Sequence, residues 1–224
     1  MKIFFLGTGA ADWDIEKHKD MEGFRRNSSV LIDDTLLIDP GPHVPDALST
    51  FNKKVDKIKH VINTHPHSDH FNEGTLEYLS EAKFYPMAEG EVLTIGKYTV
   101  TALRANHSTC ERAVHFIISD GEKNLFYGFD GAWLMYDEVK AIKKCGIDLA
   151  VLDATVGKSL GDFRIFEHND LNMVIDIKTS LEKDIKRVFI SHMARILHVS
   201  HSDTAAYMKP HGIEVAFDGC EVEI

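Results

Sequence analysis

Short apolar runs alternate with more polar stretches along most of the chain. The runs are rich in Val, Ile, Leu, Phe or Thr and predict strands at 1–6, 28–33, 35–39, 58–63, 91–95, 97–105, 113–119, 124–129, 147–153, 186–191 and 213–218. Helices are predicted near 43–51, 72–80, 133–144, 169–183 and 202–209. The charged segments 11–27 and 155–167 lack periodicity and are expected to be surface loops. Interleaved strands and helices indicate the α/β class.

The length and composition fit one enzyme domain. A chain of 224 residues can form a single α/β unit, so we expect one domain over 1–224. Residues 1–6 are too short for the apolar part of a signal peptide, and no apolar run approaches the roughly 20 residues of a membrane span. We therefore expect a cytoplasmic protein. Cys110, Cys145 and Cys220 are too few and too scattered for a disulfide framework.

The charge balance bears on the choice of partner. With 35 acidic and 25 basic side chains the formal net charge is −10, which opposes long-range attraction of nucleic acid. A small anionic substrate remains compatible, because bound divalent ions can reverse the sign of a site inside an acidic protein. We expect neither a nucleic-acid nor a membrane partner, and the sequence leaves a homodimer open.

Potential metal ligands are most concentrated in the run His65-Pro66-His67-Ser68-Asp69-His70, directly after the apolar, β-branched stretch 60–64. In extended backbone, residues two apart project to one side, so His65, His67 and Asp69 can converge while His70 points to a neighbouring volume. A solvated polar loop is the alternative, but imidazoles packed this tightly repel one another when protonated. The spacing therefore predicts a metal site at a strand end, with one loop serving two adjacent ions.

Further ligands are expected at other strand ends, because one loop cannot close a site around two ions. His107 follows the strand 97–105, Asp130 follows 124–129, and His192 follows 186–191. Each of these residues alone could simply cap a turn, but the three together are more specific for a metal site. The early Gly7-Thr8-Gly9 does not fit a dinucleotide-binding fingerprint, because the third glycine would fall on Asp12 and no helical pattern follows.

These motifs resemble the metallo-β-lactamase superfamily. Besides the histidine-rich run, the resemblance rests on His107, Asp130, His192 and the segments 5–11, 26–29, 36–41, 151–155, 168–172 and 214–219. It implies a four-layer αββα sandwich with metals at the sheet edges. Within the superfamily the sequence is most similar to the phosphoribosyl cyclic-phosphate phosphodiesterases of the carbon-phosphorus lyase pathway.

The resemblance also implies a ligand set. One ion would be held by His65, His67, His107 and Asp130, and the second by Asp69, His70 and His192 with Asp130 bridging. Imidazole and carboxylate suit zinc, manganese or iron. Two divalent ions and two carboxylates leave a charge of about +2, and a hydroxide lowers it to about +1, which suits a phosphodiester monoanion.

Three further side chains have candidate roles. A metal-bound hydroxide is expected to attack phosphorus, with Asp69 in the catalytic group, and His168 would protonate the leaving oxygen or contact phosphate. The alternative for His168 is an exposed histidine before a helix that starts at Asn169 or Asp170. Asp39 and Asp153 would brace a metal-binding histidine or hold a turn.

Two segments depart from the related phosphodiesterases. His198 and His201 lie in a longer stretch after His192, and the loop 11–27 lacks cysteines for the structural zinc site of those enzymes. Their roles stay open. The other histidines show no convergent pattern and are expected to be structural or exposed: His18, His43, His60, His115 and His211. Among basic residues, Arg25, Arg26, Arg104 and Lys158 are candidates to reach a phosphate.

The leading hypothesis is a dinuclear phosphodiesterase acting on a small cyclic or linear phosphodiester. Hydrolysis of a carboxyl ester, thioester or lactone is a rival, because the same hydroxide attacks carbonyls. A tRNA 3′-processing endonuclease would need a basic arm that the sequence does not provide. An iron redox protein of this superfamily usually has glutamate where this chain has His67. A non-catalytic binding module conflicts with the intact ligand set.

Overall fold

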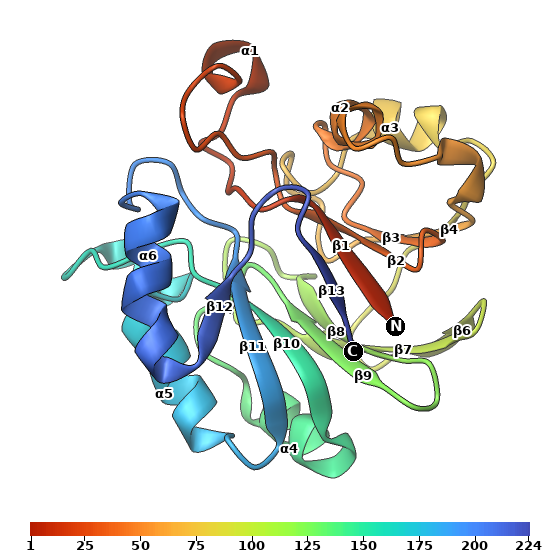
Figure 1. Cartoon of the computed structure of the whole chain (residues 1–224). Coiled ribbons are helices and arrows are strands. Elements are labelled where there is room, and N and C mark those ends of the chain that lie inside the picture. The colour runs from red at the N-terminus through yellow and green to blue at the C-terminus, as the bar shows by residue number, and fades with distance from the viewer.

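The computed structural model describes residues 1–224, and its strands form two sheets (Figure 1). The first sheet has the strand order β13 (Glu221–Glu223), β1 (Lys2–Gly7), β2 (Ser29–Ile32), β3 (Leu36–Ile38), β4 (His60–Ile62), β5 (Lys83–Tyr85). The second has the order β12 (Ile213–Val215), β11 (Ile185–Ser191), β10 (Ile147–Asp153), β9 (Asn124–Gly128), β8 (Val114–Ser119), β7 (Tyr98–Arg104), β6 (Val92–Ile95).

Helices cover the outer face of each sheet (Figure 1). The first sheet is covered by α2 (Val44–Thr50) and α3 (Glu73–Tyr78), which pack on the outward side chains of its strands. The second is covered by α4 (Tyr136–Cys145), α5 (Leu171–Ser180) and α6 (His201–Met208). Short helical turns complete the chain: α1 (Ile15–His18), η1 (Val55–Lys57), η2 (Phe163–Phe166) and η3 (Lys209–His211).

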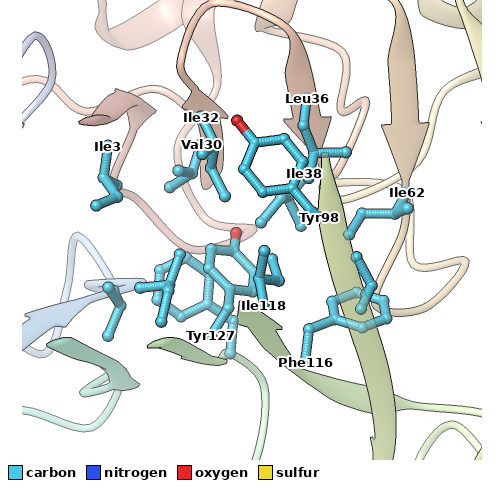
Figure 2. Packing of buried hydrophobic residues seen from close by; sticks show 14 of the residues in the cluster. Ile3, Val30, Ile32, Leu36, Ile38, Ile62, Tyr98, Phe116, Ile118 and Tyr127 are labelled. Atoms are coloured by element: carbon cyan, nitrogen blue, oxygen red, sulfur yellow. The ribbon is translucent and has the colours of Figure 1, made fainter. Parts of the chain in front are cut away.

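The main core lies between the two sheets. Figure 2 shows Ile3, Ile38 and Ile62 of the first sheet facing Phe116 and Tyr127 of the second. Successive side chains of a strand point to opposite faces, so the central strands pack on the other sheet on one side and on helices on the other. Such strands are apolar without alternation, as their sequences show. The structure therefore confirms the α/β class and the four-layer αββα arrangement.

The strand directions bring the candidate site residues to one region. β10 pairs with both β9 and β11 in parallel, and β3 pairs with β4 in parallel. The carboxyl ends of β9, β10 and β11 therefore lie at one edge of the second sheet, and those of β3 and β4 at one edge of the first. The chain segments that follow these strands carry most of the candidate ligands.

The structure contains every predicted strand and main helix, with small differences at the ends. Two edge strands, β5 and β13, were not predicted, because each is short and has a charged residue at one end or at both, Lys83 in β5 and Glu221 and Glu223 in β13. The predicted loops 11–27 and 155–167 contain the single turns α1 and η2. The three cysteines are free thiols. None of the helices is long and apolar enough to cross a bilayer.

Candidate metal centre

Three of the site residues lie within two positions of the end of a strand and have left-handed backbone. Asp39, Asp130 and His192 have φ values of 62°, 53° and 59°, respectively. For a residue with a side chain this conformation costs ~1–2 kcal/mol. Strained backbone of this kind gathers at functional sites, where surrounding contacts hold it in place. Here it turns the chain sharply at three strand ends of the two sheets, where Asp130 contacts His192 and Asp39 contacts His70.

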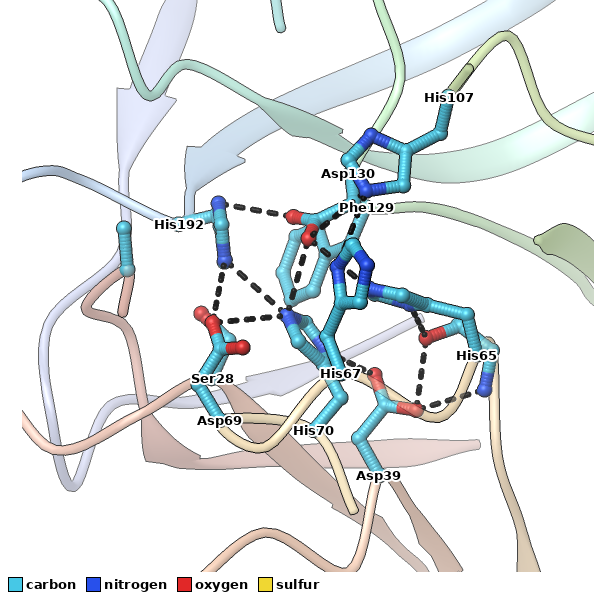
Figure 3. A network of polar contacts seen from close by, with 12 residues as sticks. Ser28, Asp39, His65, His67, Asp69, His70, His107, Phe129, Asp130 and His192 are labelled. Carbon is cyan, nitrogen blue, oxygen red and sulfur yellow. Dashed lines mark hydrogen bonds and ion pairs between the residues drawn. The ribbon is translucent and has the colours of Figure 1, made fainter. Parts of the chain in front are cut away.

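The candidate ligands form two adjoining groups (Figure 3). Within each group the ligand atoms all lie within 4.8 Å of one another, and Asp130 belongs to both. The first group is His65, His67, His107 and Asp130, and the second is Asp69, His70, Asp130 and His192. All are buried except His67, which is partly exposed. A third group, Asp130, Asp153, His168 and His192, overlaps the second and includes two residues outside the implied ligand set. The structure thus brings together the seven side chains that the sequence had assigned to two ions; that they bind metal stays a prediction.

The contacts among the ligand atoms show whether cations would fit between them. His70 Nε2 lies 3.1 Å from His192 Nε2, and His67 Nδ1 lies 3.2 Å from His107 Nε2. Two ring nitrogens at this distance are both satisfied only if one carries a proton. His65 Nε2 and Asp130 Oδ1 are buried and make no hydrogen bond. Neither is isolated, since polar atoms lie 3.2 Å and 2.9 Å away, but the alignment is unsuitable for a hydrogen bond. A cation would satisfy these inward-facing lone pairs.

The buried carboxylates of the centre remain ionised and give it negative charge. Burial raises the pKa of Asp130, but the charges of His192 and His70 outweigh burial and hold that pKa well below its usual value. Burial lowers the pKa of His192, yet Asp130 and Asp69 raise it to about 10. Burial lowers the pKa of His107 to about 4. The centre therefore holds ionised carboxylates in a site shielded from water, which favours divalent cations.

Asp39 braces one of the candidate ligands. Its Oδ2 lies 3.0 Å from His70 Nδ1 and accepts a hydrogen bond from Tyr127 at 3.1 Å. Its Oδ1 accepts from the Thr64 backbone N–H at 2.7 Å and from the Thr64 hydroxyl at 2.9 Å. A carboxylate in this position fixes the orientation of the imidazole and leaves Nε2 to face an ion. This geometry favours the bracing role over the turn.

A second carboxylate, Asp153, contacts His168. Asp153 Oδ2 lies 2.7 Å from His168 Nδ1, and Asp153 Oδ1 accepts the Thr155 backbone N–H at 2.7 Å. The Thr155 hydroxyl lies 2.7 Å from His192 Nδ1 and donates to the His192 carbonyl at 2.9 Å. Asp153 thus braces His168, a histidine outside the seven ligands that the resemblance implies, and both residues form a third His/Asp group with Asp130 and His192. Asp170, rather than Asn169, caps α5.

His168 lines a small pocket in front of the candidate ligands. The pocket has a volume of about 240 Å³, and His67, Asp69, His107, Asp130 and His192 contribute to its wall. The His168 side chain is only 16% exposed, which argues against a solvated histidine before a helix. The structure places His168 beside the candidate ligands, and its catalytic role stays a prediction.

Some residues of this region were not predicted from the sequence. Arg164 is the basic side chain of the pocket wall, and Thr155 and Glu167 contact His192 and His107. Arg164 and Glu167 lie in the aperiodic segment 155–167, where no sequence pattern distinguishes them, and Thr155 ends the motif 151–155 without a role having been assigned to it. The basic candidates proposed from sequence do not line this pocket. Arg25, for example, is buried and donates to Thr8 and to the Ala216 carbonyl.

The two departing segments support the backbone around His192. In the loop 11–27, Asp12 accepts the backbone N–H groups of Arg195 and Ile196 at 2.8 Å and 3.1 Å. Trp13 donates to the Met193 carbonyl at 2.9 Å. His198 Nε2 lies 2.6 Å from the Ala154 carbonyl, and His201 Nδ1 lies 3.1 Å from the Arg25 guanidinium. These histidines therefore contact the scaffold and are absent from both ligand groups.

Comparison with known proteins supports the resemblance to the metallo-β-lactamase superfamily. A model of the metallo-beta-lactamase superfamily matches residues 23–87. The metallo-beta-lactamase fold protein YhfI from Bacillus subtilis has a TM-score of 0.79 at 18% identity, covering 100% of this chain and 99% of that chain. A diphosphatase of the PhnP family has a TM-score of 0.75 at 19% identity, with coverages of 100% and 96%. The short form of human tRNase Z has a TM-score of 0.73 at 18% identity, with coverages of 100% and 99%.

At these identities the solved structures establish the fold alone. The chain has the metallo-β-lactamase fold, and the family model together with the His/Asp groups supports a place in that superfamily. The comparison with curated proteins found no match. The more specific assignment to the cyclic-phosphate phosphodiesterases stays a proposal.

The purified protein is expected to carry about two transition-metal ions per chain, because seven side chains exceed the needs of one tetrahedral site. Elemental analysis gives the stoichiometry directly. His67→Ala is expected to lose metal, whereas His211→Ala, at an exposed position, keeps both ions. A fully active and folded sample that holds no ion, or one, contradicts the dinuclear centre.

Proposed function

We propose that the protein is a dinuclear metal-dependent hydrolase that cleaves a small cyclic or linear phosphodiester. The observation that carries this proposal is the His168–Asp153 pair beside the two ligand groups. A hydrolase acting on a phosphodiester needs an activated water, compensation of the phosphate charge and a proton for the leaving oxygen. Two bound divalent ions would supply the first two, and zinc or manganese suits the donor atoms, with iron as a further option.

His168 is suited to supply the proton. Its Nδ1 faces the Asp153 carboxylate at 2.7 Å, so this nitrogen carries a proton and Nε2 is available to the pocket. Burial lowers the pKa of His168, but the Asp153 carboxylate outweighs burial and raises it above the ordinary value. Asp153 therefore favours the protonated form of His168. In this state Nε2–H can donate to the leaving oxygen as its bond to phosphorus breaks.

The rest of the pocket restricts what can bind. Asp69, which we group with the catalytic residues, and Asp130 face the same space as the histidines, while Ala10, Ala11 and Ala194 form an apolar wall. A volume of about 240 Å³ suits a small substrate or the reacting end of a larger one. Arg164 adds a guanidinium at the wall, although Asp162 pairs with it at 2.6 Å.

A tRNA 3′-processing activity is the main rival, since the fold is shared with human tRNase Z. Binding of tRNA depends on many contacts between basic side chains and phosphates. The net charge of −10 opposes such contacts. Cleavage of carboxyl esters, thioesters or lactones is the second rival, because the same metal hydroxide would attack carbonyls. The PhnP-family protein that shares this fold is a diphosphatase, which supports chemistry at phosphorus.

The substrate class can be tested by direct competition. Small phosphodiesters, including cyclic ribose phosphates and bis(p-nitrophenyl) phosphate, are expected to be hydrolysed far better than precursor tRNA at about 0.15 M salt. Simple lactones and thioesters serve as the carbonyl comparison, and each reaction is run with zinc and with manganese. Efficient cleavage of tRNA at one position would replace this proposal with the endonuclease.

His168→Ala is expected to keep both metals and the fold but to lose roughly 10²- to 10⁴-fold in turnover, the usual contribution of a positioned general acid. The loss should shrink for p-nitrophenolate, because a good leaving group needs little protonation. Turnover with a series of leaving groups measures this dependence. Equal losses across the series would assign His168 to phosphate binding, and unchanged turnover would remove it from the site.

A further inference from the structure

A buried ion pair lies next to the chain neighbours of Asp130, and neither of its residues belongs to a ligand group. His115 on β8 and Glu138 on α4 are each 1% exposed, and His115 Nδ1 lies 2.6 Å from Glu138 Oε1. The other ring nitrogen, His115 Nε2, lies 2.9 Å from the carbonyl oxygen of Phe129. Both nitrogens face acceptors, so each donates a proton and the ring is a charged imidazolium. Burial lowers the pKa of His115, but Glu138 outweighs burial and raises it.

Such a pair is not explained by stability. Desolvating two charges is costly, and apolar residues of similar volume often stabilise a core as well or better. Apolar side chains lie beside the pair, since the His115 and Phe126 rings pack in a T-shaped arrangement and Ile142, on α4 like Glu138, is fully buried. A role other than stability is therefore expected for this buried pair between β8 and α4, and its contacts with the backbone around Asp130 indicate one.

The His115 ring contacts the backbone on both sides of Asp130. Its Nε2–H bonds the Phe129 carbonyl, immediately before Asp130. On the other side the ring lies against Gly131, where an added Cβ would be 2.7 Å from the ring carbon Cε1. Asp130 itself has the left-handed φ of 53°. The ring therefore contacts both neighbours of the residue whose conformation is strained.

Glu138 fixes the ring in turn. Its second oxygen, Oε2, accepts the backbone N–H of Met135 at 2.6 Å, at the start of α4. The carboxylate thus joins the first turn of a helix to a strand of the second sheet. Because both oxygens are engaged, the position of Glu138 defines the orientation of the imidazole and, through it, the backbone around Asp130.

We propose that His115 and Glu138 form a positioning pair that holds Asp130 in the conformation in which its single carboxylate faces both candidate ion sites. Neither residue contacts the pocket or belongs to a ligand group. The pair acts through the backbone on the shared ligand. The proposal requires a metal centre but not a phosphodiester substrate, so it can hold even if the proposed reaction is wrong.

The main test is Glu138→Gln, which keeps the shape of the side chain and removes its charge. Binding of Mn²⁺ to chelator-treated protein is measured by isothermal titration calorimetry, and the fold by circular dichroism. We expect a folded variant that binds Mn²⁺ about tenfold or more weakly, as is typical when support for a ligand is removed. Wild-type affinity in the folded Glu138→Gln variant would overturn the proposal.

The matched control is Ile142→Ala on the same helix. This change lowers the unfolding temperature through a core cavity, but it removes no contact with the backbone around Asp130. We expect its Mn²⁺ affinity to stay within about twofold of wild type. If Ile142→Ala weakened binding as much as Glu138→Gln, general loss of stability would explain the effect and the proposal would fail.

A second pair of variants decides the matter if Glu138→Gln does not fold. His115→Gln retains an amide N–H that can reach the Phe129 carbonyl, whereas His115→Leu retains only volume. We expect the glutamine variant to bind Mn²⁺ more tightly than the leucine variant. Equal affinities would show that the hydrogen bond to Phe129 has no role in holding Asp130. Because the readout is metal affinity, failure here is distinct from failure of the proposed phosphodiesterase activity.

Discussion

The main constraint on this structure is the burial of several imidazoles and carboxylates close together, because these groups lose their contacts with water and some of them repel one another. Four imidazoles of the candidate centre and two carboxylates are buried where the two sheets meet, with their polar atoms directed inward. Burying charges without compensation costs several kcal/mol for each ion. Contacts between the carboxylates and the histidines satisfy part of this demand, but ring nitrogens still face ring nitrogens. Divalent cations are the groups that would satisfy all these atoms at once.

The remaining features of the centre follow from this demand. Each sheet supplies part of the ligand set at its strand ends, and the two parts meet across the inter-sheet core. Tyr127, inside that core, links them by donating to Asp39, which in turn braces His70. The left-handed residues at three strand ends are stable because surrounding contacts hold them. Packing of the two sheets and geometry of the centre are therefore coupled.

The sequence predicted the elements and ligands whose signals are local. Apolar runs predicted the strands, and ligand types directly after those runs predicted His107, Asp130 and His192. The resemblance to a superfamily placed His168 near them. Residues joined only by tertiary packing could not be predicted: His115 and Glu138 are 23 positions apart and carry no motif. Arg164 and Glu167 lie in an aperiodic loop, where their position depends on the fold.

The most direct test of the central claim is anomalous X-ray diffraction from crystals of the protein loaded with manganese or zinc. Data collected at the absorption edge of the metal locate each ion. The structure leads us to expect two peaks about 3.5–4 Å apart, the usual spacing of paired catalytic ions. Asp130 would contact both peaks, His107 one and His192 the other. A single peak, or two peaks that do not share Asp130, would contradict the account.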